Sequence, residues 1–228
     1  MREVEALFKY LRLPDLFTIL NALFGLSAVF LLSQDRGQAT LASIFILIGA
    51  CLDSLDGFLA RKLKQGILGG NLDSFADLIT FGLAPVAICY ILLSSVLTAI
   101  CSALFLICGM LRLARFNILP KTDSFIGMPI TAAGLFVALF VLAFKDSTYI
   151  NLIIPLLLIL SYLMISRITY PKIRDIRLMF LLGAVLMLTL TGYYLDIKQL
   201  LQFGSYVMLA LITLYILSPT VGRIRHKK

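Results

Sequence analysis

The sequence has little charge, no tryptophan and a single histidine. Only 14% of its 228 residues are charged, whereas 61% are hydrophobic, and the mean hydropathy is +1.00. So few charged side chains cannot cover a water-facing surface of ordinary size, which argues against a soluble globular domain. The one histidine, His226, lies in the basic C-terminal tail. A catalytic histidine and a histidine-based metal site are therefore both excluded.

Cysteine is absent from the polar segments, where a disulfide framework or a zinc site would need it. The four cysteines all lie inside apolar stretches, where a thiol is an ordinary core side chain. We therefore expect free thiols at Cys51, Cys89, Cys101 and Cys108.

Long apolar runs recur along the whole chain, which excludes a signal peptide or a single anchor. A helix of about 20 mostly apolar residues spans a bilayer. Charged or turn-rich breaks separate eight such segments. They cover residues 13–33, 39–60, 72–93, 97–113, 125–144, 149–166, 178–195 and 200–218. No long linker divides them, so we expect one domain over residues 1–228, an all-α polytopic membrane bundle of about eight helices.

Lys and Arg concentrate on the cytoplasmic side of membrane proteins, because translocating positive charge is disfavoured. With eight spans, all but three of the 20 Lys and Arg residues fall on the side of both termini. The exceptions are Arg36, Lys145 and Lys198. We therefore expect both termini and the active site to face the cytoplasm from the cell membrane. The formal net charge of +8 then faces anionic lipid head groups, not nucleic acid.

The segment before the first apolar run has its own pattern. Val4, Leu7, Phe8 and Leu11 occur at i, i+3, i+4 and i+7 among charged residues. This spacing predicts a short helix lying in the membrane interface. A frayed terminus is the alternative.

Four aspartates lie where the second and third apolar runs meet the short connection between them: Asp53, Asp56, Asp73 and Asp77. A charged residue costs about 2.5–3.5 kcal/mol near the centre of a membrane helix, so these side chains should face a polar cavity and have partners. Residues at i, i+3 and at i, i+4 share a helix face, which applies to each pair. We expect the two helices to be antiparallel neighbours that bring both pairs together.

Four negative charges in one pocket need compensation. Arg61 supplies one positive charge, and no other Lys or Arg lies within the apolar stretches beside the aspartate pairs. A carboxylate donor set without His or Cys suits Mg²⁺ or Mn²⁺. Two such ions can bridge a pyrophosphate and stabilise charge on the attacking and leaving oxygens. A structural Asp/Arg network and an ion pathway are the alternatives.

These residues resemble the signature of the CDP-alcohol phosphotransferases, D-x2-D-G-x2-A-R, a spacer, then G-x3-D-x3-D. The matching positions are Asp53, Asp56, Gly57, Ala60, Arg61, Gly69, Asp73 and Asp77. The spacer, residues 62–68, is one residue shorter than is typical of the family. Residues 74–77, 81–85, 109–117, 125–129 and 161–166 are similar to the phosphatidylserine synthase branch of that family.

The resemblance implies a role for each matching residue. The four aspartates would hold the metals, and Asp77 would also accept the proton of the attacking hydroxyl. Arg61 would contact the pyrophosphate of a CDP-lipid. The remaining residues implied for the CDP-lipid pocket are Thr18, Asn21, Asp53, Gly57 and Ala60. For Thr18 and Asn21, interhelical hydrogen bonding without a ligand is the alternative.

The resemblance also implies the reaction, in which an alcohol attacks the lipid-side phosphate of CDP-diacylglycerol or CDP-archaeol and CMP leaves. For L-serine as the alcohol, Arg112 and Arg115 at the end of the fourth run are placed to bind the carboxylate, since arginine binds carboxylates bidentately. Anchoring of a helix end is the other reading of this pair. A homodimer is implied as well.

Other functions remain open at this stage. A sister enzyme would use glycerol 3-phosphate or inositol 1-phosphate, and these acceptors would require a further basic cradle for their phosphate. A cation transporter or channel could also use intramembrane aspartate pairs. It would not need Gly57, Ala60 and Arg61 at their fixed spacing.

Overall fold

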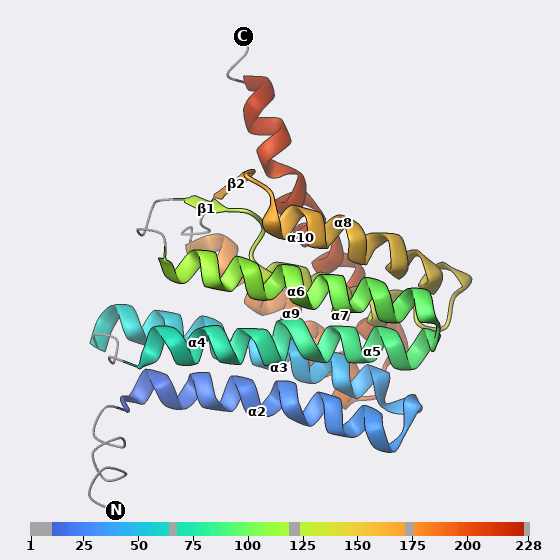
Figure 1. Ribbon diagram of the computed structural model, residues 1–228. Helices are drawn as coiled ribbons and strands as arrows, with labels where there is room; N and C mark the ends of the chain where they lie inside the picture. The colour runs from blue at the N-terminus through green and yellow to red at the C-terminus, as the bar shows by residue number, and fades with distance from the viewer. Residues whose placement is uncertain (1–10, 64–67, 119–123, 172–175, 226–228) are drawn as a thin grey trace, which may run out of the picture.

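The computed structural model describes residues 11–63, 68–118, 124–171 and 176–225. Most of the helices lie side by side, whereas the C-terminal helix projects away from the others (Figure 1). The helices are α2 (Leu13–Gln34), α3 (Ala39–Leu63), α4 (Gly69–Asp77), α5 (Ala84–Leu93), α6 (Val96–Ile118), α7 (Ile130–Phe144), α8 (Ile153–Ile165), α9 (Ile176–Tyr194) and α10 (Lys198–Arg225). The short elements are the 3-10 helices η1 (Arg36–Gln38) and η3 (Thr148–Leu152), the π-helix η2 (Leu78–Leu83), and strands β1 (Ser124–Ile126) and β2 (Thr169–Pro171). The expected all-α bundle is confirmed.

Several helices are long and apolar enough to cross a membrane, so the chain is a multi-pass membrane protein. In the described residues six segments meet this measure: Leu13–Gln34, Arg36–Leu63, Gly69–Leu93, Val96–Ile118, Thr148–Ile165 and Lys198–Pro219. Two further apolar helices, Ile130–Phe144 and Leu182–Tyr194, are shorter. The count of eight spans stays a prediction. The interfacial helix expected over residues 4–11 lies almost wholly outside the described residues.

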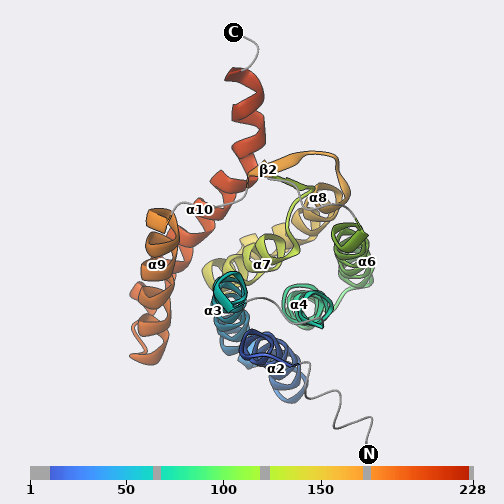
Figure 2. The same ribbon diagram turned by 90° about the vertical axis from the view of Figure 1, so that its left-hand side faces the viewer.

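Helix α7 lies at the centre of the bundle. Most of its side chains are buried, including Val137, Leu139 and Val141, because neighbours contact it on several sides. An apolar helix without a polar face is what such a position requires. Helices α9 and α10 pack against each other beside the others (Figure 2), and Tyr206 of α10 donates a hydrogen bond to the Ala143 carbonyl at 3.2 Å.

The fifth helix begins later than the apolar run predicted. Residues expected to open that helix form β1, which pairs antiparallel with β2, and the helix begins only at Ile130. Gly127 has φ +78°, a left-handed conformation that ends the strand and that glycine adopts without strain. Pro129 then caps the helix in an extended conformation. Hydropathy alone did not distinguish strand and turn from helix here.

The third span is not a regular helix throughout. Directly after Asp77 it passes through the π-helix η2 before continuing as α5. Two neighbouring helices approach η2 through glycines: a Cβ on Gly25 of α2 would lie 2.6 Å from Thr80 Cα, and one on Gly134 of α7 would lie 2.6 Å from Phe81 Cα. The π segment is therefore held between helix backbones, and π-bulges of this kind are frequent at functional sites.

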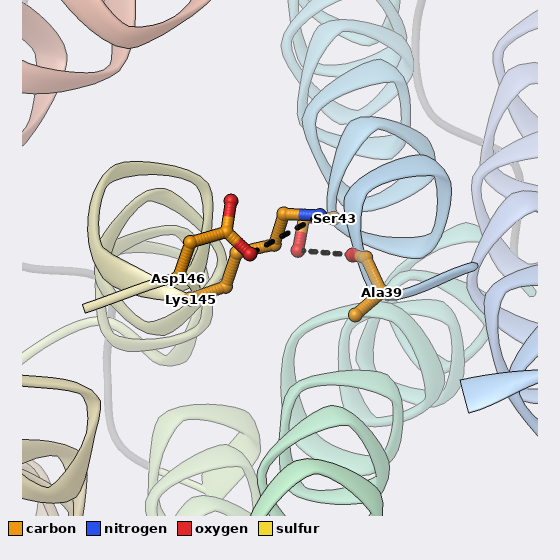
Figure 3. Close-up of polar contacts among 4 residues, drawn as sticks. All are labelled: Ala39, Ser43, Lys145 and Asp146. Carbon is orange, nitrogen blue, oxygen red and sulfur yellow. Dashed lines mark hydrogen bonds and ion pairs between the residues drawn. The ribbon is translucent and has the colours of Figure 1, made fainter. Parts of the chain in front are cut away.

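The two ends of the bundle differ in their polar residues. At one end η1 carries Arg36, Lys145 is the C-cap residue of α7 and α10 begins at Lys198. Figure 3 shows the Lys145 side chain extending toward α3 near Ser43, with its Nζ 4.0 Å from the Asp146 carboxylate. Asp53 and Asp56 lie in the half of α3 farther from η1, and Asp73 and Asp77 lie on α4.

Candidate active site

Helices α3 and α4 bring three of the predicted aspartates into one cluster. Asp53, Asp56 and Asp73 each offer a carboxylate oxygen, and these oxygens lie within 4.8 Å of one another. The i, i+3 spacing puts Asp53 and Asp56 on one face of α3, and α4 faces them with Asp73. The carboxylates of the two helices therefore converge, as the spacing predicts.

Asp77 completes this carboxylate cluster from the end of α4. Its side chain is buried, and its carboxyl group lies within hydrogen-bonding reach of Asp53. Among the described residues, no hydrogen-bond partner reaches its other oxygen, Oδ1. A buried carboxylate oxygen without a partner is costly, which indicates that a ligand or cation satisfies it in the working protein.

The first span contributes a hydroxyl to the cluster. Thr18 of α2 donates a hydrogen bond of 2.8 Å to Asp56 Oδ2. Asn21 lies one turn further along α2 and is completely buried, and no partner within the described part of the chain reaches its side-chain amide. Its backbone carbonyl accepts a 2.8 Å hydrogen bond from Thr80 Oγ1 of η2. The structure thus places Thr18 in contact with the cluster and Asn21 one helical turn further along α2.

The sequence pointed to one cationic side chain, Arg61, together with metal ions to compensate the carboxylates, and the structure brings Arg112 to them as well. Arg112 of α6 is 7% exposed and interacts electrostatically with Asp53, Asp73 and Asp77. It comes from a helix distant in sequence, so inspection of the runs that carry the aspartates did not reveal it. Its guanidinium Cζ lies 5.4 Å from the Phe116 ring centroid and 5.8 Å from that of Phe125.

The arginine of the signature lies near the C-terminal end of α3, in the last turn of the helix. Arg61 is exposed, and its Nη1 atom would lie 3.8 Å from a Cβ on Gly57, the only neighbour within 4 Å of that position among the described residues. Space is therefore open beside Gly57, one residue after Asp56. Ala60 lies half-buried on the same helix.

Arg115 has a different environment from Arg112. Its guanidinium donates to the backbone carbonyls of Ile126, Met164, Ile165 and Ser166. These carbonyls belong to β1 and to the C-terminal end of α8. The pair Arg112 and Arg115 therefore does not act as one basic patch: one guanidinium faces the carboxylates and the other faces main-chain oxygens.

Some residues near the cluster were not predicted from the sequence. Asp15 is buried at the start of α2, accepts the Arg12 backbone N–H at 2.8 Å and interacts electrostatically with Asp56. Its position in the first helical turn, where carboxylates are favoured, was a signal that could have found it. Nothing in the local sequence pairs Ser74 of α4 with Asn117 of α6, which hydrogen-bond at 3.0 Å.

The chemistry of the donor set fits a divalent cation. The cluster offers carboxylate oxygens only, some of them shielded from solvent, and hard cations such as Mg²⁺ and Mn²⁺ prefer oxygen ligands. Asp77 Oδ1, which no hydrogen-bond partner in the described part of the chain reaches, is a further ligand atom. The acidic cluster Asp53, Asp56 and Asp73 therefore suits metal-assisted chemistry on an anionic substrate.

Four carboxylates from two membrane helices, with the signature arginine on one of those helices, define a class of membrane phosphotransferases. The chain belongs to the CDP-alcohol phosphatidyltransferase family, whose sequence model matches residues 11–166. It is 41% identical over 172 residues to a CDP-diacylglycerol--serine O-phosphatidyltransferase of Bacillus subtilis, covering 71% of this chain and 91% of that protein.

Two archaeal relatives extend this comparison. A CDP-diacylglycerol--serine O-phosphatidyltransferase of Methanocaldococcus jannaschii is 37% identical over 185 residues, which cover 81% of this chain and 86% of the relative. An archaetidylserine synthase of Methanothermobacter thermautotrophicus is 36% identical over 180 residues, which cover 76% of this chain and 75% of the relative. The family resemblance seen in the sequence is confirmed, and the chain is a transferase.

Proposed function

We propose that this protein transfers a phosphatidyl-type group from a CDP-lipid to the hydroxyl of L-serine and releases CMP. The observation that carries the proposal is the convergence of both aspartate pairs with a buried arginine, Arg112, beside them. The carboxylates suit the metal-bound pyrophosphate, and the arginine suits an acceptor that carries a carboxylate. The similarity to relatives named for serine transfer supports the choice of acceptor.

Two divalent ions, Mg²⁺ or Mn²⁺, would be held by the four carboxylates of Asp53, Asp56, Asp73 and Asp77. When bound, such ions neutralise the pyrophosphate and stabilise charge on the attacking and leaving oxygens. The Thr18 hydroxyl, bonded to Asp56 Oδ2 at 2.8 Å, orients that carboxylate as an outer-shell partner does in metal sites.

The remaining signature residues suit the CDP side of the substrate. Arg61 lies at the exposed edge and would bind a pyrophosphate oxygen, where arginine is a strong partner. The open space beside Gly57 would admit the nucleotide, with Ala60 along the same helix. Asn21, one turn further along α2 than Thr18, would contribute its side-chain amide, which no partner among the described residues reaches.

The reaction is a displacement at phosphorus. The serine hydroxyl oxygen forms a bond to the lipid-side phosphorus, and the bond from that phosphorus to the bridging oxygen breaks. The bridging oxygen leaves with CMP and carries the electron pair. Asp77 would accept the hydroxyl proton as general base. Its buried position beside Asp53 and Asp73 supports this role.

On the acceptor side, Arg112 would bind the serine carboxylate, because it is the buried guanidinium that faces the cluster. Arg115 was predicted to share this role. Its contacts with four main-chain carbonyls favour a structural role instead. The sister acceptors glycerol 3-phosphate and inositol 1-phosphate would require a phosphate cradle in addition.

The setting proposed for the enzyme is the cytoplasmic membrane, with both termini and the active site toward the cytoplasm, and a homodimer as the assembly. The separation of the carboxylate cluster from Arg36, Lys145 and Lys198 at opposite ends of the bundle supports this orientation. The lipid is CDP-diacylglycerol or CDP-archaeol. Relatives named for both lipid classes resemble the chain at similar identity.

The substitution Asp77→Asn tests the mechanism. We expect serine-dependent CMP release from CDP-diacylglycerol with Mg²⁺ or Mn²⁺ to fall by about 10²–10⁴-fold, the range for losing a general base. Asp146→Asn, which changes the exposed aspartate at the opposite end, is the matched control and should retain the wild-type rate. Undiminished release by Asp77→Asn would contradict the assigned role.

A further inference from the structure

Arg115 lies where three separate parts of the chain meet. Its Nη2 donates to the Ile126 carbonyl of β1 at 2.6 Å and to the Met164 carbonyl at 2.9 Å, and its Nη1 donates to the Ile165 and Ser166 carbonyls at 3.2 Å each. The last carbonyls of a helix lack intrahelical partners, so the guanidinium satisfies the end of α8 while it holds β1. These contacts match the four N–H bonds of its two terminal nitrogens.

The backbone at Gly127 packs closely against this guanidinium. Gly127 has φ +78°, and a Cβ at that position would collide with Arg115 Nη2 and the Met164 carbonyl oxygen. The Gly127 N–H donates to the Ile168 carbonyl at 2.8 Å, and the Met128 N–H donates to the Leu163 carbonyl at 3.0 Å. The turn after β1 is thus fixed by glycine, by backbone hydrogen bonds and by the arginine.

This fixed strand contacts the arginine that faces the carboxylates. Arg112 lies one turn before Arg115 on α6, and its guanidinium lies over the rings of Phe116 and Phe125 at 5.4 and 5.8 Å. Phe125 belongs to β1 and directly precedes Ile126, whose carbonyl Arg115 holds. Arginine stacked on aromatic faces keeps its plane in one orientation. The placement of β1 therefore sets one of the two rings that orient Arg112.

We propose that Arg115 is a positioning residue for the acceptor: it holds β1 so that Phe125 orients the Arg112 guanidinium toward the acceptor carboxylate. This inference rests on the proposed function for the identity of the acceptor. Arg115 itself does not touch the acceptor, because its two terminal nitrogens are directed at main-chain oxygens. Lysine cannot replace it, since an ammonium lacks the planar fork that reaches both β1 and α8.

Steady-state kinetics of Arg115→Lys test the proposal. We expect the KM for L-serine to rise about tenfold, the scale of one hydrogen bond involving a charged group. The KM for CDP-diacylglycerol and the kcat should stay within about threefold, because the CDP pocket lies on α2 and α3. Arg167→Lys, an exposed arginine on the neighbouring loop, is the matched control and should behave as wild type.

A double-mutant cycle with Phe125→Leu identifies the route of the effect. If Arg115 acts through Phe125, adding Arg115→Lys to Phe125→Leu changes the serine KM little further, so the effects are strongly non-additive. Additive effects would overturn the proposal, as would equal rises in the KM values of both substrates.

Hydrogen–deuterium exchange tests the geometry without any enzymatic readout. Arg115→Lys should accelerate exchange of the Gly127 and Met128 amides, whereas Arg167→Lys should not. A raised serine KM with unchanged exchange would mean that Arg115 binds the acceptor directly and would overturn the proposal. If the wild type uses another alcohol, the proposed function fails, and accelerated exchange together with a raised KM for that alcohol would still support the positioning role.

Discussion

At the scale of single residues, the site depends on contacts between helices that are distant in sequence. Asp53, Asp56, Asp73 and Asp77 could be predicted as a group because helical periodicity and a short connection are local properties. Arg112 could not be predicted as their partner, because which face of α6 meets α4 is decided by packing. The same holds for Phe125, which the apolar pattern assigned to a helix and which lies in β1.

Substitution of Thr18 tests the hydrogen bond between this residue and Asp56. Thr18→Val removes the hydroxyl that donates to Asp56 Oδ2 and nearly keeps the side-chain volume. We expect the apparent affinity for Mn²⁺ to fall about tenfold or more, as for other outer-shell partners of metal ligands, measured by Mn²⁺ titration of activity. Thr191→Val removes an exposed hydroxyl that bonds only within its own helix, and should leave Mn²⁺ affinity unchanged. Equal affinities in both variants would contradict the outer-shell role.

At the scale of elements, the third span shows what hydropathy predicts and what it misses. The apolar run correctly gave a membrane segment ending at Leu93. It did not reveal that residues Leu78–Leu83 form a π-helix. A π-helix differs from an α-helix in its backbone hydrogen bonds, and hydropathy does not register that difference. The glycines that face η2 from α2 and α7 are meaningful only once the helices are placed.

Substitution of Gly134 tests the importance of this close packing. A Cβ on Gly134 would press on the Phe81 backbone, which cannot rotate away as a flexible side chain would. Overpacking of this kind costs about 1–3 kcal/mol, so Gly134→Ala should lower the midpoint of thermal unfolding in detergent. In Gly183→Ala the added methyl meets nothing within 4 Å, and its midpoint should match or exceed that of the wild type. An unchanged midpoint for Gly134→Ala would show that η2 can shift to make room.

At the scale of the whole molecule, composition was enough to predict a polytopic helical bundle, since a chain with 61% hydrophobic residues must be covered by lipid. The distribution of Lys and Arg predicted which ends of the helices lie together. In the structure Arg36 lies in η1 directly before α3, Lys145 extends toward Ser43 in the first half of α3, and Lys198 begins α10. The aspartates lie in the second half of α3 and on α4. Cytoplasmic placement of the aspartate end stays a prediction, because the fold itself does not distinguish the two sides of a membrane.

The choice of acceptor depends on elements that are far apart in the sequence, namely helices α3, α4 and α6 together with β1. The signature on α3 and α4 explains the CDP-lipid half of the reaction. The acceptor half depends on Arg112 and on what surrounds it. A carboxylate-bearing alcohol is matched by one buried guanidinium, whereas a phosphorylated alcohol would bring a further negative charge into a cluster that already holds four carboxylates.

The most direct test of the central claim is incorporation of labelled L-serine into lipid by the purified protein, with CDP-diacylglycerol and Mg²⁺ or Mn²⁺. Glycerol 3-phosphate and inositol 1-phosphate serve as competing acceptors in parallel reactions. We predict serine-dependent product formation, with one CMP released for each serine incorporated. Product formation only with a phosphorylated alcohol, or no metal-dependent CMP release with any acceptor, would contradict the account.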